Sequence, residues 1–125
     1  MSASRQRTIL LAEDNSIIAI TLEDELAQAG FAIAGPFASC SSALTWLDQN
    51  TPDAAVLDVS LGDGPCNELA STLTQRGIPF VVHSGYGKDS ASAEFVGAQW
   101  IVKPALPGAI AQALATTFAA EASYE

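Results

Sequence analysis

Four short apolar segments of this sequence each end in a residue that is charged or carries a hydroxyl. Residues 9–12 (Ile-Leu-Leu-Ala) precede Glu13 and Asp14, and residues 54–57 (Ala-Ala-Val-Leu) precede Asp58. Carboxylates at the ends of buried strands are costly unless a cation or a reaction holds them there. The four ends carry Glu13-Asp14, Asp58, Ser84 and Lys103. This pattern predicts strands whose ends assemble one polar site.

The apolar segments alternate with longer amphipathic ones, which indicates alternating strands and helices. We expect strands at residues 8–12, 31–35, 54–58, 78–83 and 99–102. We expect helices at residues 16–29, from Ser39 or Ser41 to about 50, 65–76 and 106–120, with a short or mobile one between Ser84 and Lys103. Gly30 and Gly77 are predicted to end helices, Pro36 to end the second strand, and Pro65 to lie in a first helical turn.

This alternation predicts an α/β fold with a parallel sheet covered by helices on both faces. The architecture we expect is a flavodoxin-like (βα)5 doubly wound sheet of strand order 2-1-3-4-5, whereas a different strand order would scatter the polar ends. The 125 residues, 49% of them hydrophobic, suit a single domain over residues 1–125, with its core at about 7–121. The early apolar segment is too short for a signal peptide or a membrane span, so we expect a cytoplasmic protein without a membrane partner.

The net charge of −9 comes from 14 acidic against 5 basic residues. Such a surface repels phosphate backbones, which argues against a nucleic-acid partner. It suits divalent cations or a basic protein partner, although negative charge also keeps an alanine-rich domain in solution. Cys40 and Cys66 match no metal or redox spacing, so we expect two free thiols in a reducing compartment.

In this strand order, ligands bind beyond the carboxyl ends of the first and third strands, where Glu13, Asp14 and Asp58 are expected. Clustered carboxylates share protons or hold a hard cation, and Mg²⁺ suits them. With Lys103 and the Ser84 hydroxyl beside them, they could stabilise a phosphoryl group in transfer. Asp58 could then attack as the nucleophile and become an aspartyl phosphate.

At this point the chain resembles a response-regulator receiver domain, the phosphoacceptor module of bacterial two-component signalling. The resemblance covers residues 7–121. It rests on Leu11-Ala12-Glu13-Asp14-Asn15, Val56-Leu57-Asp58-Val59-Ser60, Ser84-Gly85 and Val102-Lys103-Pro104. Residues 79–86 also resemble a variant motif, Pro-Phe-x-x-Ala-Thr-Gly, of single-domain receivers from alphaproteobacteria.

The resemblance implies that Asp58 is the phosphorylated aspartate and that Mg²⁺ is the cofactor. It implies that Asp14, Asp58 and the backbone carbonyl of Ser60 bind the metal, with Glu13 acting through water. Ser84 would contact the phosphoryl group and move on activation, and Lys103 would pair with Asp58 or its phosphate.

Several residues near the site depart from the family pattern or invite another reading. Ser84 stands for the commoner Thr, Trp100 for a Tyr or Phe, and the span between Ser84 and Lys103 is about a turn shorter than usual. We interpret His83 as a packing residue, because strand alternation turns it away from Ser84, and Asp63 as a helix-start residue. Trp46 is expected in the core or a half-exposed patch, and Tyr86 either gates the site or is simply exposed.

The function that follows is a phosphorelay receiver that takes a phosphoryl group from a sensor histidine kinase or a histidine phosphotransfer protein. A downstream protein would read the phosphorylated state in trans, and catalysis would be confined to the chain's own phosphorylation and dephosphorylation. The alternative is a non-phosphorylated, receiver-like protein-interaction module. A metal-dependent phosphohydrolase or a flavodoxin-like cofactor protein is a third possibility, disfavoured by the lack of a further general acid beside Asp58.

Overall fold

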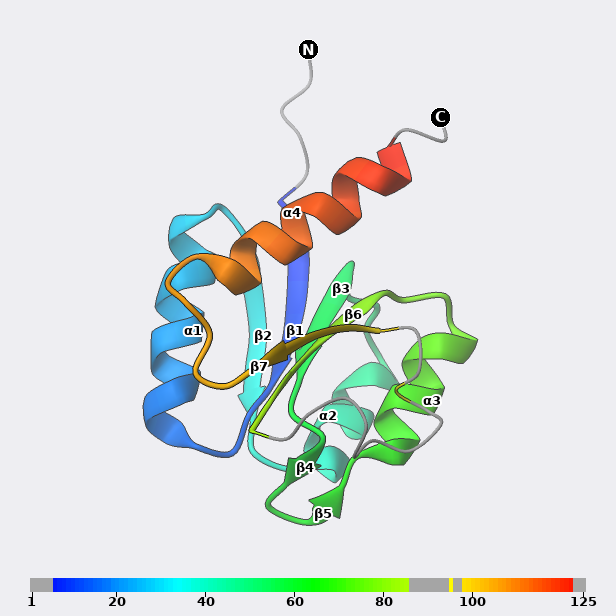
Figure 1. Ribbon diagram of the computed structural model, residues 1–125. Helices are drawn as coiled ribbons and strands as arrows, with labels where there is room; N and C mark the ends of the chain where they lie inside the picture. The colour runs from blue at the N-terminus through cyan, green and yellow to red at the C-terminus, as the bar shows by residue number, and fades with distance from the viewer. Residues whose placement is uncertain (1–5, 86–94, 96–97, 123–125) are drawn as a thin grey trace.

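The computed structural model describes residues 6–85, 95 and 98–122 (Figure 1). Five parallel strands form one sheet in the order β2-β1-β3-β6-β7. The strands are β1 (Thr8–Ala12), β2 (Ala32–Phe37), β3 (Ala54–Leu57), β6 (Phe80–Ser84) and β7 (Gln99–Val102). This is the predicted order 2-1-3-4-5 of a flavodoxin-like fold, so the predicted fold class is confirmed.

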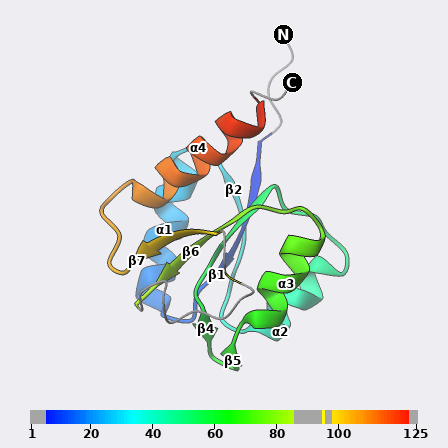
Figure 2. The ribbon, with the colours of Figure 1, turned by 45° about the vertical axis from the view of Figure 1, so that its right-hand side comes forward.

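Within the described residues, four helices cover the two faces of the sheet. They are α1 (Ser16–Gln28), α2 (Cys40–Leu47), α3 (Asn67–Gln75) and α4 (Ala109–Ala122). Figures 1 and 2 show α1 and α4 together on one face and α2 and α3 together on the other. Among the described residues, no helix combines the length and the apolar character needed to cross a lipid bilayer.

Alternate residues of the central strands face opposite sides of the sheet and build two cores. In β1, Leu10 packs on the side of α2 and α3, whereas Ile9 and Leu11 pack on the side of α1 and α4. The strand residues that directly precede the acidic side chains are buried. They are Leu11 and Ala12 in β1, and Ala55, Val56 and Leu57 in β3. Burial on both faces explains why these strands are continuous apolar segments.

The second strand differs from the prediction, because β2 runs through Pro36 to Phe37. The edge position of β2 tolerates a residue without an N–H donor. Gly35 has a φ of 106°, and a Cβ atom there would lie 2.7 Å from the carbonyl oxygen of Leu11. The pairing with β1 shifts register at this point, and Glu13 N–H then donates to the Phe37 carbonyl at 2.9 Å.

The segment after β3 also differs from the prediction. Pro65 does not open a helix but belongs to β5 (Gly64–Pro65), which pairs antiparallel with β4 (Ser60–Leu61). The hairpin delays the start of α3 to Asn67. A proline suits either place, since an edge strand and a first helical turn both lack a required N–H donor.

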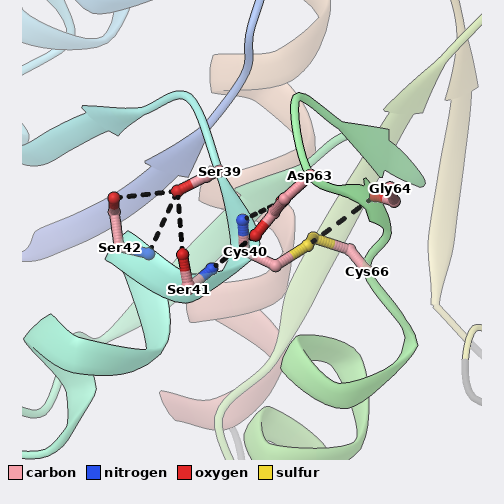
Figure 3. The surroundings of a disulfide bond; sticks show 7 residues. All are labelled: Ser39, Cys40, Ser41, Ser42, Asp63, Gly64 and Cys66. Atoms are coloured by element: carbon pink, nitrogen blue, oxygen red, sulfur yellow. Dashed lines mark hydrogen bonds between the residues drawn. A yellow bond between two sulfur atoms is a disulfide. The ribbon is translucent and has the colours of Figure 1, made fainter.

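The prediction of two free thiols is wrong, because Cys40 and Cys66 form a disulfide (Figure 3). Their Cα atoms lie 5.7 Å apart, within the ordinary range for a disulfide, although 26 positions separate them in sequence. Cys40 begins α2, and Cys66 directly precedes α3. The β4–β5 hairpin carries Cys66 back toward α2, a long-range approach that cysteine spacing does not reveal.

Asp63 does occupy a helix start, but that of α2 rather than of the helix that follows it. Its carboxylate accepts hydrogen bonds from the backbone N–H groups of Cys40 at 2.8 Å and Ser41 at 3.1 Å. Ser39 caps the same helix as predicted, accepting from the N–H of Ser42 at 3.1 Å. The hydrogen bonds from Cys40 and Ser41 lower the pKa of Asp63 below its usual 3.8.

We expect Asp63→Ala to be less stable than the wild type at neutral pH, with the difference shrinking in acid. A carboxyl whose pKa is lower in the folded state stabilises the fold above its unfolded pKa, and this contribution disappears as the pH falls through the folded value. Urea midpoints at neutral pH and below pH 3.8 would test this expectation. A stability difference that grows in acid would contradict the assigned role.

Candidate functional site

The acidic pair after β1 is held in place by backbone contacts. Glu13 is 3% exposed, and its carboxylate accepts from the N–H of Asn15 at 3.1 Å. Asn15, rather than Asp14, is the N-cap of α1, since its side chain accepts from the N–H groups of Ile17 and Ile18. Glu13 is therefore buried rather than solvated, and Asp14 does not cap the helix. Asp14 is exposed.

Asp58 and Ser84 follow the neighbouring strands β3 and β6. The N–H of Asp58 donates to the Ala12 carbonyl at 3.1 Å, which fixes the backbone of Asp58 beside the end of β1. Leu57 pairs with Val82, so Ser84 lies two residues further along the adjacent strand. Ser84 is fully buried, and its carbonyl accepts from the N–H of Lys103 at 2.7 Å.

Lys103 joins the carboxylate of the buried Glu13 to that of the half-buried Asp58. Its Nζ lies 2.7 Å from Oδ2 of Asp58 and 2.9 Å from Oε1 of Glu13. The exposed fractions of the three side chains are 16% for Lys103, 12% for Asp58 and 2% for Glu13. Burial by itself lowers the pKa of Lys103, but the hydrogen bonds and charges of Asp58 and Glu13 outweigh it and raise that pKa above 10.5. The ammonium therefore stays charged throughout the neutral range.

Three carboxylates meet beside this ammonium. Glu13, Asp14 and Asp58 each offer an oxygen, and these oxygens lie within 4.8 Å of one another. Hard oxygen donors at such separations are the ligands Mg²⁺ takes in proteins, so the side chains fit this cation. Ser60 lies two residues past Asp58, at the start of β4. The structure thus gathers Glu13, Asp14, Asp58 and Lys103, with Ser60 and Ser84 on the adjoining segments.

His83 lies under α1, where it faces a cavity of about 460 Å³ lined largely by apolar side chains. It is 4% exposed, and neither ring nitrogen has a hydrogen-bond partner among the residues that the structure describes. Burial, followed by the charge of Lys103, lowers its pKa below 6.5. A neutral ring within the apolar packing agrees with the interpretation of His83 as a packing residue.

The two tryptophans are half-buried on the face of α2 and α3. Trp46 contacts Phe37, with ring centres 6.2 Å apart. Trp100 packs edge-on against the fully buried Phe95, with ring centres 6.4 Å apart. The predicted short helix after Ser84 and the two readings of Tyr86 fall largely at residues 86–94, 96 and 97, outside the described residues.

Sequence reasoning missed two features of the site's surroundings. One is Asn15, whose N–H holds the Glu13 carboxylate; an Asn ahead of an amphipathic segment was the available signal. The other is the attachment of the hairpin after Asp58 to α2 through Asp63 and the disulfide. No local pattern indicates that attachment, because its partners are more than 20 residues apart.

Comparison with known proteins agrees with this architecture. A family model described as the response regulator receiver domain matches residues 9–115. SdrG from Sphingomonas melonis Fr1 is 33% identical with a TM-score of 0.79, and the match covers 93% of this chain and 99% of that one. The BeF3-activated conformation of SdrG, from Pseudomonas melonis Fr1, matches at 34% identity with a TM-score of 0.71, covering 92% and 98% of the two chains.

A more distant structure shares the fold. The CheY-like receiver domain protein from Methanospirillum hungatei JF-1 is 19% identical, with a TM-score of 0.87 and coverage of 97% of this chain and 100% of that one. A search of curated proteins gives no match. The match of the family model across most of the chain decides the assignment: the chain belongs to the response regulator receiver domain family.

Proposed function

We propose that this receiver accepts a phosphoryl group on Asp58 from a phosphohistidine. The observation that carries the proposal is the position of Lys103, whose ammonium contacts both Asp58 and Glu13 beside three carboxylates that meet within 4.8 Å. A catalytic carboxylate, a cation site and a fixed ammonium are the groups that phosphoryl transfer to an aspartate requires. Family membership supports the same chemistry.

In the transfer, a carboxylate oxygen of Asp58 attacks phosphorus while the bond between phosphorus and the histidine nitrogen breaks. The product is an acyl phosphate on Asp58 and a free imidazole on the donor. Lys103, whose ammonium contacts Asp58, would donate to the charged phosphoryl oxygens, and the Ser84 hydroxyl would contact the phosphoryl group after transfer. Bound Mg²⁺ would supply charge neutralisation, held by Asp14, Asp58 and the Ser60 carbonyl, with Glu13 acting through water.

The donor is a sensor histidine kinase or a histidine phosphotransfer protein, in the cytoplasm. A downstream protein then reads the phosphorylated surface in trans. We expect no turnover of other substrates, because the chain's catalysis serves its own phosphorylation and dephosphorylation. The net charge of −9 favours protein partners over nucleic acids.

The test is a titration with beryllofluoride, a mimic of the phosphoryl group, followed by amide chemical shifts. We expect shifts at Asp58, Ser84 and Lys103 that appear with beryllofluoride only when Mg²⁺ is present. A relative at 34% identity has been solved in a BeF3-activated conformation, which makes the reagent suitable. Unchanged amides around Ser84 would contradict phosphoacceptance and support the non-phosphorylated interaction module.

Asp14→Asn should weaken Mg²⁺ binding by about tenfold or more, since it removes one charged oxygen ligand from a site with few of them. Calorimetric titration with Mg²⁺ would measure the change. Asp48→Asn is the matched control, because Asp48 is exposed at the end of α2 and does not belong to the acid cluster. Equal losses in the two variants would point to a general effect of net charge and would contradict the assigned role of Asp14.

A further inference from the structure

Residues 59–66, which directly follow Asp58, are tied to the start of α2. The N–H of Gly62 donates to the Ala38 carbonyl at 3.0 Å, and Asp63 accepts from the N–H groups of Cys40 and Ser41. The disulfide between Cys40 and Cys66 closes the same contact covalently. Figure 3 shows the sulfur bridge and the Asp63 carboxylate side by side at the first turn of α2.

Residues 59–66 form a hairpin whose two ends are hydrogen-bonded to each other directly after Asp58. The N–H of Cys66 donates to the Val59 carbonyl at 2.8 Å, and Ser60 pairs with Pro65 within the hairpin. A restraint on Cys66 therefore acts on Val59 and Ser60, the two residues after Asp58. The carbonyl of Ser60 is one of the proposed Mg²⁺ ligands, so the restraint reaches the metal site through a few residues of backbone.

We propose that Cys40 and Cys66 form a reversible redox modification site, and that the disulfide form of the receiver binds Mg²⁺ more tightly than the dithiol form. The coupling to Mg²⁺ rests on the proposed function. The cross-link holds residues 59–66 against α2 before the cation arrives. In the dithiol form, residues 59–66 are held against α2 only by hydrogen bonds and packing. They therefore lose more conformational entropy on Mg²⁺ binding than in the disulfide form, which weakens the binding.

The redox step is exchange with glutathione. In reduction, a glutathione thiolate attacks Sγ of Cys40, the sulfur–sulfur bond breaks, and Cys66 leaves as a thiolate that takes up a proton. A second glutathione thiolate attacks the glutathione sulfur of the mixed disulfide, and Cys40 leaves and is protonated. Two glutathione thiols supply two electrons and two protons in total and become one glutathione disulfide; oxidation of the protein is the reverse.

The positions of the two sulfurs suit this exchange. Both cysteines are buried, and Cys40, at 8%, is the more exposed of the two, so attack falls on Cys40 when the start of α2 opens locally. Cys66 is the N-cap residue of the nine-residue helix α3, where the positive end of the helix dipole stabilises a departing thiolate. Disulfides that form in reducing compartments are usually transient and regulatory rather than structural.

The redox half of the proposal is tested by thiol counting. The full chain is equilibrated in buffers that span a wide range of ratios of reduced to oxidised glutathione. Free thiols are then alkylated, and the mass of the intact protein is measured by mass spectrometry. We expect both cysteines to convert together from alkylated to cross-linked within the series. A bridge that survives the most reducing ratio, or thiols that survive the most oxidising one, would overturn reversibility.

The coupling is tested by calorimetric titration of Mg²⁺ into the oxidised and the chemically reduced wild-type protein. We expect the oxidised form to bind Mg²⁺ at least about threefold more tightly than the reduced form, because the disulfide already restrains residues 59–66. The double variant Cys40→Ala/Cys66→Ala should bind like the reduced form in every glutathione buffer. Equal affinities of the oxidised and reduced wild type would overturn the coupling alone.

Failure of the proposed function would look different. If neither form bound Mg²⁺, the receiver chemistry proposed for Asp58 would be wrong, and the coupling would fall with it. Thiol counting would still decide whether the disulfide is reversible, because that measurement involves neither the cation nor phosphorylation.

Discussion

Asp58→Asn is expected to abolish phosphorylation of this receiver by a small phosphodonor such as acetyl phosphate in the presence of Mg²⁺. The amide has nearly the shape of the carboxylate but lacks the charged oxygen that attacks phosphorus. We expect labelling to fall at least about a hundredfold, to background, because only loss of the nucleophile removes the bond-forming step itself. The increase in mass of the intact protein on phosphorylation is the measurement.

Asp48→Asn is the control for Asp58→Asn, because the substitution changes the net charge by the same amount and Asp48 is exposed at the end of α2. Its labelling should match the wild type. Retained labelling of the Asp58→Asn variant, with the phosphoryl group mapped to another residue, would contradict the assignment of Asp58 as the acceptor.

Lys103→Met is expected to destabilise the fold by roughly 3 kcal/mol at neutral pH, because it leaves the largely buried carboxylates of Glu13 and Asp58 without their cation. Saturating Mg²⁺ should restore more stability to this variant than it adds to the wild type, since the cation replaces the missing positive charge. Urea unfolding with and without Mg²⁺ measures both effects.

The effect of Lys103→Met should depend on pH in a defined direction. The pKa of Lys103 is raised in the folded state, so its stabilising contribution is complete below the unfolded value of 10.5 and is lost as the pH rises through the folded value. The gap between wild type and variant should therefore close only in strong alkali. Lys103→Arg keeps the charge and should lose less stability; equal losses for Met and Arg would indicate a packing role instead.

The sequence predicted the sheet well because its central strands are buried on both faces. Such strands appear as unbroken apolar segments, and the strands predicted at 8–12 and 54–58 end within a residue of the observed β1 and β3. The alternation of strands and helices predicted a parallel sheet, for which few arrangements are allowed, and the flavodoxin-like order among them is the one observed. The acids after β1 and β3 were consequently expected on one edge, where Glu13, Asp14 and Asp58 lie.

Edge elements and long-range contacts were harder to predict. Pro36 marks the end of a strand by its local chemistry, yet β2 continues through it because an edge strand leaves one side unpaired. Pro65 fits a helix start equally well by local criteria, and only the pairing of Ser60 with Pro65 reveals a hairpin. Local propensity could not choose between these alternatives, since tertiary contacts decide them.

The same limit applies to Asp63 and to the cysteines. Asp63 caps a helix that begins 23 positions earlier in the sequence, and Cys40 meets Cys66 across 26 positions. Both contacts depend on how the hairpin after Asp58 folds back on α2. Capping rules and cysteine spacing describe neighbours along the chain, so they give no signal for such contacts.

The central claim is that Asp58 becomes an acyl phosphate with the help of a cation held by the neighbouring carboxylates. Reductive trapping tests it most directly: the protein is treated with acetyl phosphate, reduced with borohydride and digested, and the peptide containing position 58 is sequenced by mass spectrometry. We expect homoserine at position 58, formed when Mg²⁺ is present and absent when it is chelated. An unmodified Asp58 with homoserine at another position, or equal trapping without Mg²⁺, would contradict the account.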